Sequence, residues 1–270
     1  MARFDHLFPA AAAAWLLLVP GARASVISRL RSHRTSNISL QKRLHVNTLI
    51  TDPGTFEVDW AGVYSITSSN FNMPTTLKFT PAGRHILWGR TEYSVALDSL
   101  DVVDQGGGHV TQFSESVTFS GTAVLHDGQK LDIALEPQAT VFFRGENGGR
   151  FGAVAIARYD TGRNSMGVTA GWSAATASSA NNPAVTWDFG TGYGRQLPGC
   201  GLLSHFTPHA NLVWEKSVGT PKIVSVFEGV EYQITDRFAF DLSGQQFGAF
   251  AGPPDHQVVV AVTWNFGKVH

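Results

Sequence analysis

The chain has 270 residues, of which 43% are hydrophobic and 15% are charged, and its formal net charge is −1. A charge so close to zero points neither to a nucleic-acid partner nor to an acidic one. The single cysteine excludes an internal disulfide, and the length suits one all-β domain.

The first residues carry an export signal. Arg3 begins a short n-region, an apolar core of about ten residues runs from Ala10 to Val19, and Ala22-Arg23-Ala24 supplies a small-x-small cleavage pattern. We therefore expect a signal peptide over residues 1–24. The apolar core is too short for a membrane-spanning helix, which needs about twenty residues. An exported protein without a longer apolar stretch can cross a membrane only as a β-barrel.

Residues 25–51 form a basic lead-in to the patterned part of the chain. Arginine and lysine recur there, no carboxylate appears before Asp52, and no alternation is visible. We interpret this segment as a disordered periplasmic lead-in. The alternatives that it contacts anionic lipid or plugs a lumen stay open.

Strand-like segments then follow at regular spacing as far as residue 270. Apolar side chains on one face alternate with polar or small ones on the other over about ten residues, which is typical of a transmembrane β-barrel. The segments lie near residues 56–66, 75–80, 87–98, 116–125, 131–144, 151–159, 165–174, 185–193, 205–215, 224–234, 237–245 and 258–266. We predict an all-β fold over residues 52–270, an antiparallel outer-membrane β-barrel of about twelve strands.

The links between these segments support the same fold. Asp127-Gly128 is a hairpin signal, and the link at residues 235–236 is equally short. The connections at 98–112, 176–183 and 249–255 are longer, so the short and long links fall on opposite ends of a barrel. Glu228 interrupts an apolar face, and we interpret it as a rim position or a bulge.

The alternation assigns the side chains to two faces. Polar residues are expected to line the lumen, and aromatic residues to face lipid or form girdles at its two interfaces. The expected lumen residues are Glu57, Asp59, Arg90, Glu92, Asp188, His209, Asn211, Glu231, Arg237 and Asp241. The expected lipid-facing residues are Trp60, Tyr64, Tyr93, Trp172, Trp187, Trp214, Tyr232, Phe240, Trp264 and Phe266.

The histidines near residue 207 suggest an alternative, a β-barrel with enzymatic activity. The candidates are His205, His209 and Asn211 beside Ser204, but positions four apart on a strand lie about 13 Å apart. No nucleophile stands beside a base with an orienting third group, and no Cys/His cluster has metal-ligand spacing. We expect no enzymatic activity, no metal site and no cofactor.

The last part of the chain resembles a known family. The stretch 229–241, followed by 255–260 and Asn265-Phe266-Gly267, resembles the terminal strands of bacterial outer-membrane proteins that are grouped as transporters in the MetA-pathway of phenol degradation family. The resemblance covers about the last fifty residues and implies an outer-membrane β-barrel transporter. One departure is the tail, Lys268-Val269-His270, which runs past the aromatic residue that usually ends such barrels.

Together these observations predict a passive channel for small molecules, some of them aromatic or hydrophobic. Its expected partners are outer-membrane lipid, a small-molecule solute and the barrel insertion machinery, with no nucleic acid. Lumen charges of both signs would favour small polar or amphipathic solutes over a strong ion preference. A structural or adhesive barrel with a filled lumen and a periplasmic all-β binding protein are the alternatives.

Overall fold

A computed structural model describes residues 52–66, 69–81, 90–104, 109–113, 116–143, 148–178, 183–198, 201–219, 222–247 and 255–268. The expected signal peptide and the lead-in 25–51 lie outside these residues. The strands are β1 (Thr55–Ser65), β2 (Phe71–Thr80), β3 (Thr91–Asp104), β4 (His109–Phe113), β5 (Ser116–Asp127), β6 (Leu131–Phe142), β7 (Gly149–Asp160), β8 (Asn164–Ala175), β9 (Val185–Arg195), β10 (Phe206–Ser217), β11 (Ile223–Thr235), β12 (Phe238–Phe247) and β13 (Asp255–Lys268). A 3-10 helix, η3 (Gly201–His205), precedes β10.

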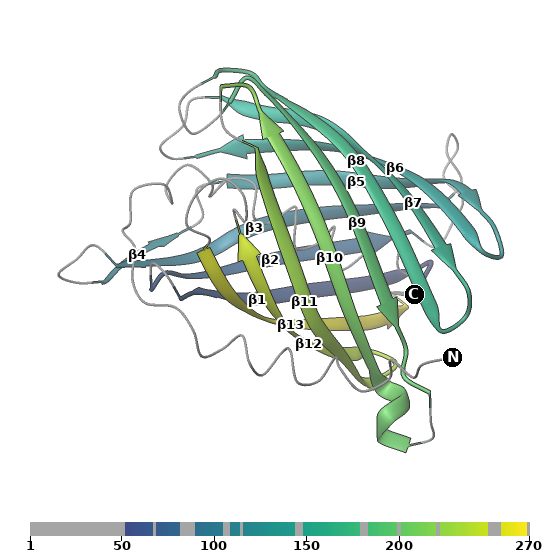
Figure 1. The fold of residues 1–270 in the computed structure, drawn as a ribbon. Helices are drawn as coiled ribbons and strands as arrows, with labels where there is room; N and C mark the ends of the chain where they lie inside the picture. Colours follow the sequence, from purple (N-terminus) through teal and green to yellow (C-terminus); the bar gives the residue numbers. More distant parts are fainter. Residues whose placement is uncertain are drawn as a thin grey trace, which may run out of the picture.

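The strands form a closed antiparallel ring (Figure 1). Each strand pairs with its neighbour in the chain, except that β5 pairs with β3 across the β4 hairpin. The first strand, β1, pairs with the last strand, β13, over a register that runs from Thr55–Lys268 to Ser65–Gln257. This pairing leaves a barrel of twelve strands with no open edge, as the alternation predicted.

Strand β4 is the element that the sequence pattern did not predict. The connection expected at residues 98–112 is instead a hairpin, in which the last part of β3 pairs with β4 from Leu100–Phe113 to Asp104–His109. In Figure 1 this hairpin projects from one end of the barrel. The prediction missed it because three consecutive glycines dominate the local sequence.

Burial alternates along each strand and identifies the inner face of the barrel. In β2, Asn72, Thr76, Lys78 and Thr80 are buried, whereas Phe79 between them is exposed. Among the described residues, buried polar and charged side chains outnumber buried hydrophobic ones. A soluble protein shows the reverse distribution, so this barrel is polar inside and apolar outside.

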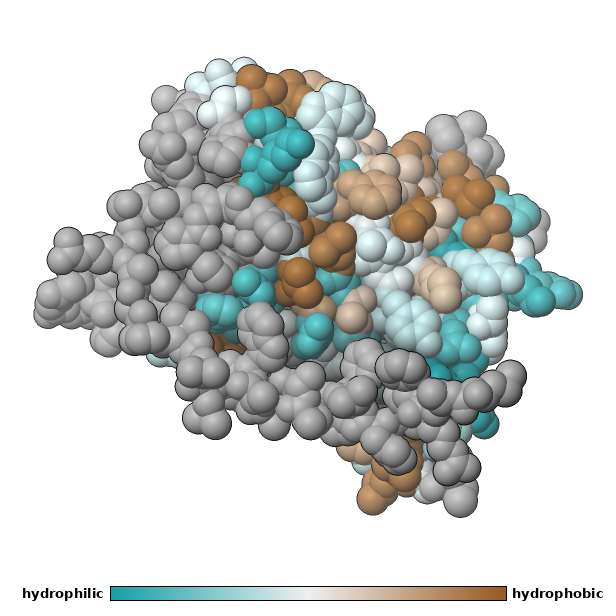
Figure 2. All heavy atoms as spheres, viewed as in Figure 1, coloured by the Kyte–Doolittle hydropathy of each residue, from teal (hydrophilic) through white to brown (hydrophobic). Residues whose placement is uncertain are grey.

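The outer face carries aromatic residues near both ends of the strands. Towards one end, register pairs join Phe56 to Phe79 and Phe79 to Tyr93. Towards the other end, Trp172 pairs with Trp187. Brown and pale side chains cover much of the coloured face in Figure 2. Aromatic side chains at two levels around an apolar band match the interfacial girdles of outer-membrane barrels.

Glu228 is a correction to the sequence interpretation. It lies inside β11, is exposed on the outer face, and pairs regularly with Ala210 on one side and Gly244 on the other. The register shift in this strand falls between Gln233 and Thr235 instead. Glu228 is therefore neither a rim residue nor a bulge but a carboxylate on the apolar outer face. Separately, none of the described helical segments is long and apolar enough to cross a bilayer.

Candidate functional site

The inner face of the barrel is the candidate site, because it collects most of the buried polar side chains. By register and burial, the expected lumen residues that lie in strands and on this face are Glu57, Asp59, Glu92, Asp188, His209, Asn211, Glu231 and Asp241. They come from β1, β3 and the strands β9 to β12, which lie on one side of the ring, and other buried polar residues on β5 to β8 extend the polar interior to the opposite wall.

Two expected lumen residues, Arg90 and Arg237, lie at strand ends. Arg90 precedes β3, and its Nη1 is 3.5 Å from Oδ2 of Asp127, which is 60% exposed. Arg237 is exposed in the turn between β11 and β12. Alternation assigns a face but not the residue at which a strand ends, so the sequence did not indicate that these two positions lie outside the strands. Arg90 is half-buried and lies two residues from the inward Glu92, and both arginines stay predicted lumen residues, now at strand ends.

The expected lipid-facing residues all lie on the outer face by register. They are Trp60, Tyr64, Tyr93, Trp172, Trp187, Trp214, Tyr232, Phe240, Trp264 and Phe266. The Trp264 and Phe266 rings stack with their centroids 4.7 Å apart, and Phe266 also lies 5.7 Å from the Phe56 ring. These contacts place an aromatic group on both sides of the β1–β13 seam.

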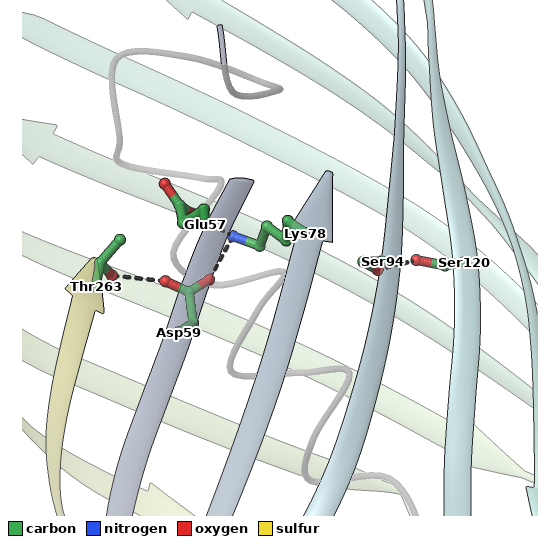
Figure 3. Close-up of polar contacts among 6 residues, drawn as sticks. All are labelled: Glu57, Asp59, Lys78, Ser94, Ser120 and Thr263. Atoms are coloured by element: carbon green, nitrogen blue, oxygen red, sulfur yellow. Dashed lines mark hydrogen bonds and ion pairs between the residues drawn. The ribbon is translucent and has the colours of Figure 1, made fainter. Parts of the chain in front are cut away.

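An ion-pair cluster lies on the inner wall at that seam (Figure 3). The Lys78 Nζ donates to Glu57 Oε1 at 3.0 Å and also contacts Asp59 Oδ2. The Thr263 hydroxyl on β13 donates to the other oxygen of Asp59 at 2.6 Å. Lys78 was not assigned to a face from the sequence, although it continues the polar positions Thr76 and Thr80. The cluster neutralises this cation with two carboxylates and ties three strands together.

A second polar group lies on the wall formed by β3, β5 and β6. The hydroxyls of Ser120 and Thr122 donate to the two carboxylate oxygens of Glu136 at 2.9 and 2.8 Å. Glu92 pairs in register with Thr122 and is 1% exposed. Glu136 was not among the expected lumen residues, because the neighbouring Pro137 was expected to break this strand or to form a bulge in it. The strand instead runs through Pro137 without a register shift there.

Arg150 organises the wall from β7 to β10. Its Nη2 donates to Ser173 Oγ and to Thr186 Oγ1, both at 2.9 Å, and its Nη1 donates to the Pro183 carbonyl at 2.7 Å. The Thr186 hydroxyl lies 2.7 Å from that of Ser217 on β10. This network holds the guanidinium against the wall instead of projecting it toward the axis.

Two carboxylates face each other beside that network. Asp188 on β9 pairs in register with Glu215 on β10, and both side chains are on the inner face. The Asp188 carboxylate lies over Gly171, where a Cβ would come within 2.5 Å of its Oδ2. Among the described residues, neither carboxylate takes part in a hydrogen bond or ion pair. The Arg150 guanidinium attracts the Glu215 carboxylate electrostatically, and both carboxylates face the interior.

His209 reaches across a neighbouring strand to Asp241. Its Nε2 lies 2.6 Å from Asp241 Oδ2, and Ser243 donates its hydroxyl to the other carboxylate oxygen at 3.0 Å. The ring passes over Gly229, where a Cβ would stand 2.9 Å from His209 Cε1. The serine binds the carboxylate and not the imidazole, so this arrangement does not activate a nucleophile.

Ser204 and His205, the other candidates for an enzymatic site, do not join the His209–Asp241 contact. Ser204 and His205 lie in η3, outside the strands, where the Ser204 hydroxyl donates to the Gly201 carbonyl. Within the parts of the chain that the structure describes, no group of three or more His, Cys, Asp or Glu residues could hold a metal ion.

Buried apolar side chains also form two clusters on the inner face of the described strands. Ala134, Val154 and Ile156 form a buried cluster with Val124, and Ala61, Val63 and Val259 form another with Ala261. The first was hard to predict because β7 is apolar on both faces. Arg158 follows Ile156 on the same face and donates to Asp160 at 2.8 Å. The interior is therefore amphipathic.

Comparison of the sequence with protein-family models and with characterised proteins gives no match. Solved structures do match. The KdgM porin aligns with a TM-score of 0.53 at 9% identity, covering 78% of this chain and 99% of that chain. The NanC porin aligns with a TM-score of 0.55 at 9% identity, covering 77% and 98%. The COG4313 outer membrane channel from Pseudomonas putida F1 aligns with a TM-score of 0.58 at 9% identity, covering 80% and 97%. The chain therefore has the fold of an outer-membrane β-barrel.

Proposed function

We propose that the protein spans the bacterial outer membrane and acts as a passive channel for small molecules. The observation that carries this proposal is the closed ring with aromatic and aliphatic side chains outside and a polar interior. Only lipid around the barrel makes such a distribution favourable, since exposed apolar surface of this extent is costly in water. The similarity to porins and to an outer membrane channel supports the same function.

Several finer assignments stay part of this proposal. They are export through a signal peptide at 1–24, a lead-in at 25–51, a barrel from 52 onward, insertion by the outer-membrane assembly machinery, and kinship with the MetA-pathway family. They rest on the sequence patterns and the terminal-strand resemblance. The proposal includes no catalytic step, because the His209, Asp241 and Ser243 geometry directs the serine to the carboxylate.

The cargo proposed is small and polar or amphipathic. The charged groups of the inner wall would bind polar parts of a solute, and the two apolar clusters would contact a hydrocarbon or aromatic part. The KdgM porin has been solved in complex with disordered oligogalacturonate, and that ligand belongs to that protein.

A filled structural barrel is the second candidate, and a specific observation favours it. Glu92 and Arg158 are each only 1% exposed although both lie on the inner face. Twelve strands also stand between the packed eight-stranded barrels and the open porins. In a filled barrel these charged side chains would stabilise the fold. Removing one partner of a buried ion pair would then lower the free energy of unfolding by about 3–5 kcal/mol.

Proteoliposome swelling separates the two candidates. Vesicles containing the purified, heat-modifiable protein are diluted into iso-osmotic solutions of a small sugar or a small aromatic solute. A channel gives swelling rates that rise with the amount of protein and fall with solute size. Rates equal to those of protein-free vesicles for every solute would contradict the channel and leave the filled barrel.

A further inference from the structure

We infer that the channel prefers cations to anions; this inference rests on the proposed channel function. The argument starts from the signs of the charges on the inner face. In the described strands the inward carboxylates are Glu57, Asp59, Glu92, Asp132, Glu136, Asp160, Asp188, Glu215, Glu231 and Asp241. The inward lysine and arginine residues are Lys78, Arg150 and Arg158.

The carboxylates are distributed round the ring and not gathered in one cluster. They come from β1, β3, β6, β7, β9, β10, β11 and β12. Within the described strands, the inward lysine and arginine residues come from β2 and β7. A solute passing along the axis would therefore meet negative charge from every side. Rings of aspartate and glutamate are the device by which protein pores favour cations, because the charge raises the local cation concentration and repels anions.

Each inward cation is already engaged by groups of the wall. Lys78 contacts both Glu57 and Asp59. Arg158 is paired with Asp160 at 2.8 Å. Arg150 donates hydrogen bonds to two hydroxyls and to a backbone carbonyl. The basic side chains are thus held against the wall, and they offer little positive field to an anion in the passage.

The opposed pair Asp188 and Glu215 places two carboxylates side by side, and the Arg150 guanidinium attracts one of them, Glu215. The two side chains face each other across β9 and β10 without a hydrogen bond or ion pair to a described residue. Two like charges side by side repel each other, and a passing cation relieves that repulsion. This pair therefore favours a cation more than an isolated carboxylate would.

An independent observation is the side chain of Asn211, on the same strand as Glu215. Asn211 is 3% exposed on the inner face, and neither its amide oxygen nor its amide nitrogen has a hydrogen-bond partner. Phe227 lies opposite it on β11. A buried amide without a partner costs free energy unless a ligand supplies one. Its oxygen can accept a hydrogen bond from an ammonium group or contact a metal cation.

The same charges separate this chain from a channel for acidic sugars. Oligogalacturonate, named with one of the similar porins, carries a carboxylate on each sugar unit. Such a polyanion would meet carboxylates on most strands of this interior. The inferred cargo is therefore a small cation or an amine. The sequence analysis expected lumen charges of both signs, and in the described strands the inward carboxylates outnumber the inward lysine and arginine residues.

The test is the reversal potential of single channels in planar bilayers separating unequal KCl concentrations. The wild-type protein is expected to give the sign for K⁺ preference. The double variant Asp188→Asn, Glu215→Gln removes two charges and keeps the shapes. Its K⁺ over Cl⁻ permeability ratio should fall about two- to fivefold, as for loss of two charges beside a water-filled path. The matched control is Glu228→Gln, which removes an outer-face carboxylate and should leave the ratio unchanged.

The outcomes are distinct. Conducting wild-type channels with anion preference, or with none, would overturn the inference and leave the channel function standing. Protein that inserts as a heat-modifiable barrel but never conducts would overturn the proposed function itself. An unchanged ratio in the double variant would show that these carboxylates do not set selectivity. If the double variant does not insert, the single variant Glu215→Gln is measured under the same criterion.

Discussion

At the scale of single residues, two glycines of neighbouring strands show how side-chain volume sets the interior. Gly229 on β11 is where the His209 ring crosses to reach Asp241. A Cβ there would stand 2.5 Å from Ser243 Cβ and 2.8 Å from the Leu242 carbonyl oxygen. The second of these is a backbone atom that cannot move without disturbing the ladder. Gly229 is therefore required by a close approach and not by its backbone angle.

We predict that Gly229→Ala lowers the free energy of unfolding by about 1–3 kcal/mol, the usual cost of overpacking. The measurement is urea unfolding from lipid vesicles, followed by tryptophan fluorescence. Gly244→Ala on β12 is the matched control, since the nearest atom to its added Cβ is 4.0 Å away. That variant should change stability by less than about 0.5 kcal/mol. Equal losses in both variants would contradict the close-packed crossing.

At the scale of elements, the alternation of apolar and polar residues predicted twelve barrel strands and their faces. This succeeded because the side-chain period of a strand is fixed by its geometry, and a closed barrel uses both faces all along its length. The features that the alternation did not predict are those that a side-chain period does not encode. The period did not show that Arg90 and Arg237 lie at strand ends, or that the glycine-rich connection contains β4.

The missed inner-face charges have the same kind of cause. Lys78 lay in the predicted segment 75–80, whose two faces were not assigned. Arg158 lay in a strand that is apolar on both faces, where periodicity does not indicate which face is inward. Partners across strands, such as Asp241 for His209, depend on register. Register follows from pairing between strands that the sequence of one strand does not specify.

The two faces of one strand make a second prediction. Leu242 points outward from β12 and is 46% exposed, while Gln245 on the same strand points inward. We expect Leu242→Arg to cost about 2–4 kcal/mol if the outer face meets lipid. Gln245→Arg should cost about 1 kcal/mol or less, because a watery interior solvates the charge. Unfolding from lipid vesicles measures both, and a large loss from the inner change alone would reverse the assignment of faces.

At the scale of the whole molecule, closure depends on the pairing of the first and last strands. The register of β1 with β13 extends over nearly the full length of β1. The Asp59 carboxylate joins Thr263 on β13 to Lys78 on β2 across this seam. Without β13, both β1 and β12 would present unpaired backbone groups to lipid, where each costs several kcal/mol. Closure is therefore expected to be all or none.

This argument gives the last prediction, a comparison of two deletions. A chain in which residues 1–24 are joined directly to residues 52–270 retains every strand that the structure describes and should fold as the full chain does. A chain ending at residue 254 lacks β13 and should not close. The readouts are recovery in the outer-membrane fraction and faster migration of the unheated protein in detergent gels. Loss of the faster band in the first deletion would show that residues 25–51 are part of the folded barrel. A faster band in the second would mean that the β1–β13 seam is not what closes it.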